Sequence, residues 1–547
     1  MNVPSISTGA DWTSLLDDGE TRARVEREAL LPFIARQRWY AGKARRAAAA
    51  TIAEWGVVPA GNEPAFLCLI DVAYADGGRE RYFVPVTASQ APAASRIERE
   101  HPANVVARLG GAREGVLHDV LEDRVASALL DAIAGSRTIP MHDGEVRALP
   151  TSAFDATRGT ARAKPLKVRR LTGEQSNTSL LYADRLILKV LRRVEPGLNP
   201  DYEIGLHLTE RTTFGGAPRL AGALEYRSGT EITTVGVLHA FVEHDTNAWE
   251  HAVGQARRFL DSVRSRPMPP AAGVVPLIAA ARQEPPGLAR DTTAGYLDRA
   301  ALIGRRTAAL HLALAAAAGE PAFEPEPLTA VECRGLADEM HERAQAAVAS
   351  VRAALDQLPA HTADAARRLF DTPAPFARVF DRLAGLDPGV SRIRIHGDYH
   401  LGQLLCTRSD VVIVDFEGEP LRSIQERRRK QPAMKDLAGM LRSFSYAAYA
   451  ALVDLAGDRP DEFVPLVPWA ERWQGRASSA FLRAYLQTAG GAGFVPHDPA
   501  ALDILLRAFL LDKAFYELIY ELNARPGWRC IPLLGILTML GPTAHSE

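Results

Sequence analysis

Three oxygen-bearing side chains occur close together in the chain at a spacing that suits phosphate chemistry. Asp398 and Gln403 are five residues apart in the polar segment 395–403, and Asp415 follows the apolar run 411–414. Phosphoryl transfer needs a carboxylate beside the attacking hydroxyl and oxygen ligands for the metal ion that bridges the phosphates. Each residue alone is better explained as part of a turn or a strand end, but their order along the chain favours the chemical interpretation. We therefore expect Asp398 to be the catalytic base and Gln403 and Asp415 to bind Mg²⁺.

A lysine within an apolar strand is the next candidate. Lys189 lies in the run Leu186–Val190, where burying an unpaired ammonium group would be costly. It therefore needs a phosphate or a carboxylate as partner. Glu203, on a predicted helix 201–209, is a candidate because a strand lysine pairs with a helix glutamate in kinases. A solvated glutamate is the alternative.

A polar segment precedes the lysine strand. Its backbone amides and hydroxyls could cover the phosphates of ATP. The residues expected to do so are Gln175, Ser176, Asn177 and Thr178. No Walker pattern GxxxxGK[ST] occurs in the chain. Polar turns between strands are common, so the segment is evidence for phosphate binding only because it precedes Lys189.

The elements that must position these residues follow from the apolar periodicity. Alternating or continuous apolar runs predict strands at 52–58, 65–74, 80–87, 186–191, 220–227 and 232–242, with a hairpin turn at Asp76-Gly77-Gly78. Apolar residues three and four apart predict helices at 121–133, 248–264, 298–317, 327–357 and 361–385. A short β region at 391–415 interrupts the helices and carries Asp398, Gln403 and Asp415.

This order predicts the α+β class and a bilobal protein-kinase-like fold. We expect an N-terminal α+β cap subdomain, a β-rich N-lobe and a mainly helical C-lobe that holds the catalytic loop and the acceptor site. The predicted boundaries are a flexible N-terminus at 1–22, the cap at 23–115, the N-lobe at 116–243 and the C-lobe at 244–547.

Composition excludes several functional classes. The 64 Lys and Arg residues nearly balance the 66 Asp and Glu residues, so no overall field attracts nucleic acid or an acidic membrane. The four cysteines are far apart and lack metal-ligand spacing. The polar N-terminus lacks the features of a secretory signal, and charges interrupt the apolar stretch 502–522. We expect a cytoplasmic protein with a small-molecule substrate.

Several blocks make the chain resemble the bacterial maltokinases, nearly from end to end. The blocks are Arg38–Lys43, Gly173–Ser179, His396–Gln403, Asp415–Pro420, Glu426–Arg429, Asp436–Phe444 and Leu511–Glu517 with Tyr520 and Glu521. The resemblance implies transfer of the ATP γ-phosphate to the anomeric hydroxyl of maltose. The product, maltose 1-phosphate, would feed α-glucan (glycogen) synthesis from trehalose. ATP and Mg²⁺ are the implied cofactors, and trehalose synthase, as a separate protein, is an implied partner.

The acceptor site is expected on the last long helix. Tyr516, Glu517 and Tyr520 share one side of that helix, and aromatic faces with a carboxylate suit a sugar. Aromatic residues at helical spacing are as often core, so that interpretation stays open. His396 and Glu417 are further acceptor-binding candidates.

Two other functions remain open at this point. Glucosamine kinases share the catalytic blocks and differ mainly where the sugar binds, so glucosamine is the alternative acceptor. A pseudokinase that senses sugar without turnover is disfavoured because Lys189, Asp398, Gln403 and Asp415 are all present.

Overall fold

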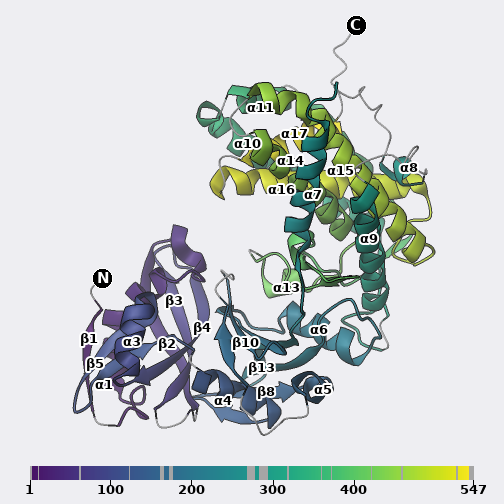
Figure 1. Ribbon diagram of the computed structural model, residues 1–547. Coiled ribbons are helices and arrows are strands. Elements are labelled where there is room, and N and C mark those ends of the chain that lie inside the picture. Colours follow the sequence, from purple (N-terminus) through teal and green to yellow (C-terminus); the bar gives the residue numbers. More distant parts are fainter. Residues whose placement is uncertain are drawn as a thin grey trace. The chain divides into compact units, whose positions relative to one another are not determined.

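The computed structural model describes residues 3–9, 11–58, 60, 63–121, 123–159, 166–171, 176–267, 277–282, 294–316, 319–358, 360–370, 373–420, 422–456, 460–524 and 528–540. The chain divides into two compact units (Figure 1). The N-terminal unit comprises Met1–Arg211, Pro218–Glu243 and Leu421–Glu426. The C-terminal unit comprises Thr212–Ala217, His244–Pro420 and Arg427–Glu547. The first is rich in strands and the second in helices, which confirms the predicted α+β class.

The first sheet of the N-terminal unit has the strand order β1-β5-β6-β4-β3-β2, with β12 added beside β4. These strands are β1 Ser5–Thr8, β2 Ala47–Val58, β3 Ala65–Tyr74, β4 Arg79–Ser89, β5 Val105–Gly111, β6 Gly115–His118 and β12 Arg193–Val194. Helices α1 Gly19–Arg24, α2 Leu31–Ala35 and α3 Ala93–Glu100 accompany them, with a π-helical turn Val25–Leu30 between the first two. The predicted hairpin joins β3 to β4, and Gly77 has the positive φ of +86° that its turn requires.

The segment 1–22, which was expected to be flexible, contains a strand and buried side chains in its described part. Strand β1 pairs in parallel with β5, placing Ser5 opposite Arg108. Ile6, Trp12, Leu15 and Leu16 are buried in the core beneath the sheet. The segment is polar in overall composition, so these apolar side chains did not stand out in the sequence. Their burial offsets the entropy cost of ordering the chain.

The second sheet of the N-terminal unit has the order β7-β8-β13-β14-β11-β10-β9. Its strands are β7 Thr138–Pro140, β8 Glu145–Pro150, β9 Val168–Arg170, β10 Thr178–Tyr182, β11 Leu186–Val190, β13 Leu220–Ser228 and β14 Glu231–Ala240. Helices α4 Asp123–Ala134, α5 Phe154–Arg158 and α6 Pro200–Glu210 belong to this part of the unit. Asn199 caps α6 by accepting a hydrogen bond from the amide of Asp201, and Pro200 occupies the first helical position.

The two sheets share one apolar core. Leu67, Leu69 and Phe83 of the first sheet belong to the same buried cluster as Leu180, Leu188 and Val237 of the second. Val125, Leu129 and Ile133 of α4 complete this cluster. The even-numbered residues of β3 instead join the other core, on the opposite face of the first sheet. Strand β3 is therefore buried on both faces, which explains its continuous apolar run.

The C-terminal unit is mainly helical (Figure 1). Its main helices are α7 Ala248–Val263, α8 Leu277–Arg282, α9 Ala294–Leu314, α10 Ala330–Ala353, α11 Ala360–Phe370, α12 Pro373–Ala384, α14 Met434–Ala456, α15 Pro460–Ala489, α16 Pro499–Ala524 and α17 Cys530–Leu540. The unit also has two small sheets. One has the order β15-β18-β19, with β15 Thr246–Asn247, β18 Leu404–Cys406 and β19 Val411–Ile413. The other pairs β16 Glu326–Leu328 with β17 Val390–Arg392. The helix predicted at 361–385 is two helices, α11 and α12. Among the described residues, no helix has the length and apolar character needed to cross a membrane.

Candidate active site

Helix α14 holds the loop that carries the predicted catalytic residues. Asp436, at its start, accepts hydrogen bonds from the amides of His396 (2.8 Å) and Gly397 (3.0 Å). Burial raises the pKa of Asp436, but the hydrogen bond and charge of His311, whose Nε2 lies 3.1 Å away, bring that pKa below its ordinary value. Ser443, seven residues on, accepts from the amide of Leu401 at 3.0 Å. Positions 436 and 443 share one face of the helix, so one helix face fixes the loop.

The structure brings Gln403 and Asp415 together within the C-terminal unit. Gln403 Nε2 donates to Asp415 Oδ2 at 3.0 Å, and the amide of Val414 donates to the carbonyl of Gln403 at 2.9 Å. Asp415 has a φ of +68°, a left-handed backbone conformation that residues other than glycine adopt infrequently. Such strain is retained mainly where a side chain must be aimed at a particular point.

The donor set of this pair fits a magnesium ion. Mg²⁺ prefers oxygen ligands and commonly takes only one or two carboxylates from the protein. The Asp415 carboxylate provides one such group. The Gln403 amide turns its nitrogen toward that carboxylate, which leaves its carbonyl oxygen as the atom suited to a metal.

Asp398 lies beside a cation that sequence reasoning did not assign to the site. Lys513 Nζ of α16 is 3.4 Å from Asp398 Oδ1 and 3.5 Å from Glu419 Oε1. Burial raises the pKa of Asp398, but the charges of Lys513 and His400 outweigh it and lower that pKa. Burial lowers the pKa of Lys513, and the carboxylates of Asp398 and Glu419 reverse this and raise it. Both groups are therefore charged at neutral pH, and the carboxylate can accept a proton.

Lys513 also borders a cavity of about 370 Å³ within the C-terminal unit. Five aromatic side chains line it: Trp249, Tyr446, Tyr516, Tyr520 and Trp528. Its other lining residues are His400, Gly402, Gly439, Ser443, Glu517 and Glu521. The three residues predicted on one side of the helix, Tyr516, Glu517 and Tyr520, are thus all on the wall of this cavity.

These three residues differ in how much they belong to the cavity or to the packing around it. Tyr520 is 47% exposed. Lys513 Nζ lies over the ring of Tyr516, 4.8 Å from its centroid. Glu517 Oε2 contacts the Nε (2.9 Å) and Nη2 (2.8 Å) of Arg442, and both side chains are nearly buried. Glu517 therefore serves to pair a buried arginine as well as to line the cavity.

His396 has different surroundings from those expected of an acceptor ligand, whereas the role of the Glu417 side chain stays a prediction. His396 is buried, its Nε2 lies 3.0 Å from the carbonyl of Val414, and its Nδ1 accepts from the amide of Asp398 at 3.4 Å. Because both ring nitrogens are used inside the loop, we reassign His396 from acceptor binding to support of Asp398. Glu417 is partly exposed, and its backbone carbonyl accepts from Arg427 Nη1 at 3.1 Å.

Lys189 and the residues around it lie in the N-terminal unit. Lys189 Nζ is 3.3 Å from Asp201 Oδ2, and His239 Nε2 is also 3.3 Å from that oxygen. Asp201 is a partner of the lysine that the sequence analysis did not name. Glu203 is buried two residues further along α6, and its pairing with Lys189 stays a prediction.

The polar segment before the lysine strand is anchored from below by a buried arginine. Arg192 Nε donates to Thr178 Oγ1 at 2.9 Å, and its backbone amide donates to Asn177 Oδ1 at 3.4 Å. Arg192 is itself fully buried and paired with Asp119 at 2.8 Å. Thr178 is buried with its hydroxyl directed to this arginine, so it supports the segment, whereas Ser176 is exposed. Gln175 lies outside the described residues.

Comparison with known proteins gives this arrangement a family context. Residues 33–123 match the maltokinase N-terminal cap domain family. The resemblance to maltokinases is thereby confirmed for this part of the chain. The match overlaps the predicted cap at 23–115, whose boundaries stay predictions.

Two curated relatives cover most of the chain. A glucosamine kinase of Streptacidiphilus jiangxiensis is 27% identical over 72% of this chain and 78% of its own length. A glucosamine kinase of Mycolicibacterium smegmatis is 24% identical over 75% of this chain and 86% of its own. A solved structure described as a glucosamine kinase in complex with glucosamine, ADP and inorganic phosphate is 22% identical, covers 98% of this chain and 100% of that one, and has a TM-score of 0.62. These comparisons confirm the predicted kinase-like fold and support a phosphotransferase activity of the kinase type.

Proposed function

We propose that this chain is an ATP-dependent sugar kinase with Asp398 as its catalytic base. The observation that carries the proposal is the position of Lys513, which contacts Asp398 and also lines the aromatic cavity. The reactive carboxylate is therefore linked to a cavity whose walls suit a sugar. Aromatic rings can cover the C–H faces of a sugar ring, and the carboxylates and hydroxyls of the wall can bind its hydroxyl groups.

The residues divide the reaction between them as follows. Asp398 accepts the proton of the attacking sugar hydroxyl as that oxygen bonds to the γ-phosphorus and ADP leaves. Lys189, oriented by Asp201, binds phosphate oxygens of ATP. Mg²⁺, when bound by Asp415 and Gln403, supplies positive charge that offsets the charge of the phosphates.

Maltose is the acceptor we propose, with phosphate transferred to its anomeric hydroxyl to give maltose 1-phosphate. The cap-domain match and the motif resemblance support this choice. Trehalose synthase, which would supply maltose for glycogen synthesis, is the proposed functional partner. Glucosamine is the second candidate, because both curated relatives are named for it.

The test is a direct assay of the acceptor. Purified protein, ATP and Mg²⁺ are incubated separately with maltose, glucosamine, glucose and trehalose, and ADP release and the phosphorylated product are measured. We expect maltose to give the highest kcat/KM and a 1-phosphate product. A higher kcat/KM with glucosamine would replace the acceptor and keep the enzyme class.

Asp398→Asn is the control for the enzyme class. It keeps the side chain's size and removes the proton acceptor, so turnover should fall ~10²–10⁴-fold while ATP still binds. Equal, background-level ADP release by this variant and the unaltered protein with every sugar would overturn the assignment as a sugar kinase.

A further inference from the structure

The segment that connects the lysine strand β11 to helix α6 contributes strand β12 to the first sheet of the N-terminal unit, which includes the predicted cap. Strand β12 pairs with β4, placing Arg193 opposite Tyr82, and the carbonyl of Arg192 accepts from the amide of Phe83 at 2.8 Å. The chain then crosses to the second sheet, where the amide of Gly197 donates to the carbonyl of Ile232 at 2.7 Å. The route from Lys189 to Asp201 is thus fixed at both sheets.

A segment distant in sequence binds to this connection. Glu195 Oε2 accepts a hydrogen bond from the amide of Ile424 at 3.0 Å. Ile424 is buried against Gly197, where an added Cβ would lie 3.0 Å from Ile424 Cγ2. Gly197 has a φ of +120°, a conformation that favours glycine, and an added methyl group would also press on Ile424. Ser423 and Glu426 exchange hydrogen bonds of 2.9 and 3.3 Å between side chain and backbone, which stiffens the segment.

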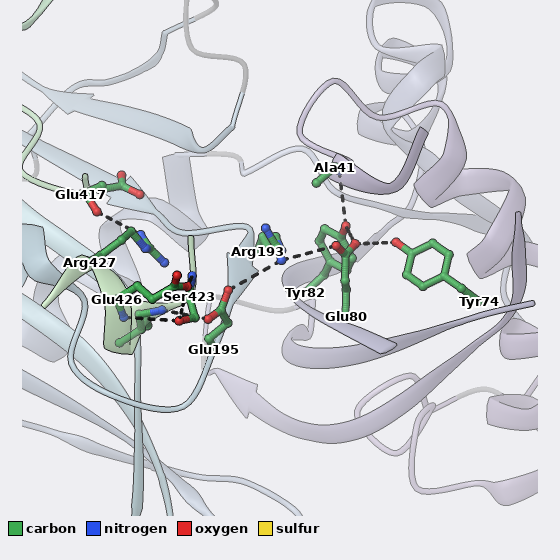
Figure 2. A network of polar contacts seen from close by, with 11 residues as sticks. Ala41, Tyr74, Glu80, Tyr82, Arg193, Glu195, Glu417, Ser423, Glu426 and Arg427 are labelled. Atoms are coloured by element: carbon green, nitrogen blue, oxygen red, sulfur yellow. Dashed lines mark hydrogen bonds and ion pairs between the residues drawn. The ribbon is translucent and has the colours of Figure 1, made fainter. Parts of the chain in front are cut away.

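A network of ion pairs and hydrogen bonds continues from Glu195 into the cap (Figure 2). Arg193 Nη2 lies 3.7 Å from Glu195 Oε1 and 3.5 Å from Glu80 Oε1. Glu80 in turn accepts from the hydroxyls of Tyr82 (2.6 Å) and Tyr74. Burial, and then the hydrogen bonds to Glu80, raise the pKa of both hydroxyls, so they remain protonated donors at neutral pH. The far end of the network is the Ala41 amide, which donates to Tyr82 Oη at 3.3 Å within the block Arg38–Lys43.

We propose that Glu80, Arg193 and Glu195 are positioning residues through which the cap holds the segment 422–426. This segment follows the loop Asp415–Pro420, so fixing it restricts where that loop can go. The inference rests on the proposed function, because the loop matters only if Asp415 acts in phosphoryl transfer. It gives the cap a role in the reaction, and it includes Ala41 and Glu426, one residue from each of the sequence blocks Arg38–Lys43 and Glu426–Arg429.

The test combines amide hydrogen exchange with kinetics on the full chain. Glu195→Ala removes the acceptor of the Ile424 amide, Glu195→Gln keeps an acceptor without the charge, and Glu80→Gln removes a charge that contacts no residue of 422–426. Glu98→Gln is the matched control, since it breaks another cap ion pair, 2.6 Å from Arg108.

We expect exchange in peptides covering 422–427 to rise about 10-fold in Glu195→Ala, less in Glu195→Gln, and measurably in Glu80→Gln. The kcat should fall about 10-fold in Glu195→Ala, because a displaced loop no longer aligns the reacting groups, while KM for ATP changes less than about twofold. Glu98→Gln should leave both measurements unchanged.

Unaltered exchange in Glu195→Ala, or an equal rise in Glu98→Gln, would overturn the proposal. So would faster exchange with an unchanged kcat, which would make the contact purely structural. If the unaltered protein phosphorylates no sugar, the proposed function fails, and the exchange measurement still decides whether the cap holds this segment.

Discussion

At the scale of single residues, the pair of Asp398 and Lys513 sets the protonation of the proposed base. Burial by itself raises the pKa of Asp398, and the charge of Lys513 outweighs this effect. A base must be ionised before it can accept a proton. The lysine therefore widens the pH range in which the carboxylate is ready to act.

Replacing Lys513 should shift the pH dependence of the reaction. In Lys513→Met the charge that lowers the pKa of Asp398 is absent, while burial still raises it. The pKa of Asp398 must then rise, and the acidic limb of the profile of kcat/KM against pH should move to higher pH. Lys513→Arg keeps the charge and should leave that limb near its original position. An unchanged acidic limb in Lys513→Met would show that another group titrates there.

Glu517 and Tyr520 line the same cavity but should respond differently to mutation. Glu517→Gln leaves the buried Arg442 without its charged partner and should lower the free energy of unfolding by about 3 kcal/mol. Tyr520→Phe alters a residue that is 47% exposed and should leave stability within about 0.5 kcal/mol. Both should raise KM for the sugar without changing that for ATP. Urea denaturation and steady-state kinetics measure the two effects, and a stability loss in Tyr520→Phe would place that residue in the core.

At the scale of elements, local signals were predicted well from the sequence. The hairpin at Asp76-Gly77, the helix that follows the lysine strand, and the apolar strand around Lys189 each depend on neighbouring residues alone. The loop with Asp398, Gln403 and Asp415 was found because its spacing follows from the chemistry.

Contacts between distant segments were not accessible in the same way. Lys513 is 115 residues from Asp398, and nothing near it in the sequence indicates which carboxylate it meets. Helix α6 was predicted, and Asp201 and Glu203 project toward nearly opposite sides of it, but the sequence does not fix which side faces Lys189, so the two could not be distinguished. The two-residue strand β12 is too short to give a periodic signal, and its pairing with β4 depends on the whole cap.

The close packing of α14 on the catalytic loop gives a prediction for an element. A Cβ added at Gly439 would lie 2.5 Å from the backbone carbonyl of Tyr399. Gly439→Ala must therefore displace the loop, lowering kcat and costing about 1–3 kcal/mol of stability. Gly475→Ala on α15 is the control, because nothing lies within 4 Å of its added methyl group. It should stabilise the protein by about 0.5–1 kcal/mol. Equal effects of the two variants on kcat would refute this account of the packing.

At the scale of the whole molecule, a buried histidine should make stability depend on pH. His118 is fully buried, with Nε2 3.0 Å from Ser89 Oγ and Nδ1 accepting from the amide of Val120. Burial, aided by the charge of Arg124, lowers the pKa of His118 to about 3. Between that value and the ordinary pKa near 6.5, the unfolded chain binds a proton that the folded chain does not, so stability falls as the pH falls.

The histidine should cost about 2 kcal/mol of stability at pH 5 relative to pH 7 or above. In His118→Gln this contribution disappears, so the loss of unfolding free energy between pH 7 and pH 5 should be smaller by roughly that amount. Urea unfolding at both pH values, followed by a probe of the N-terminal unit, measures the difference. The same pH dependence in the variant and the unaltered protein would assign the effect to other groups.

The core shared by the two sheets of the N-terminal unit bears on how such chains can be recombined. Leu67, Leu69 and Phe83 of the first sheet fill the same cluster as Leu180 and Leu188 of the second. A chimaera that exchanged the first sheet alone between relatives would place core side chains from one protein against core side chains of another that did not evolve to pack on them. The smallest set that can be exchanged intact therefore runs from β1 through β14 and includes segment 422–426, so the cap, the lysine strand and this distant segment are inherited together.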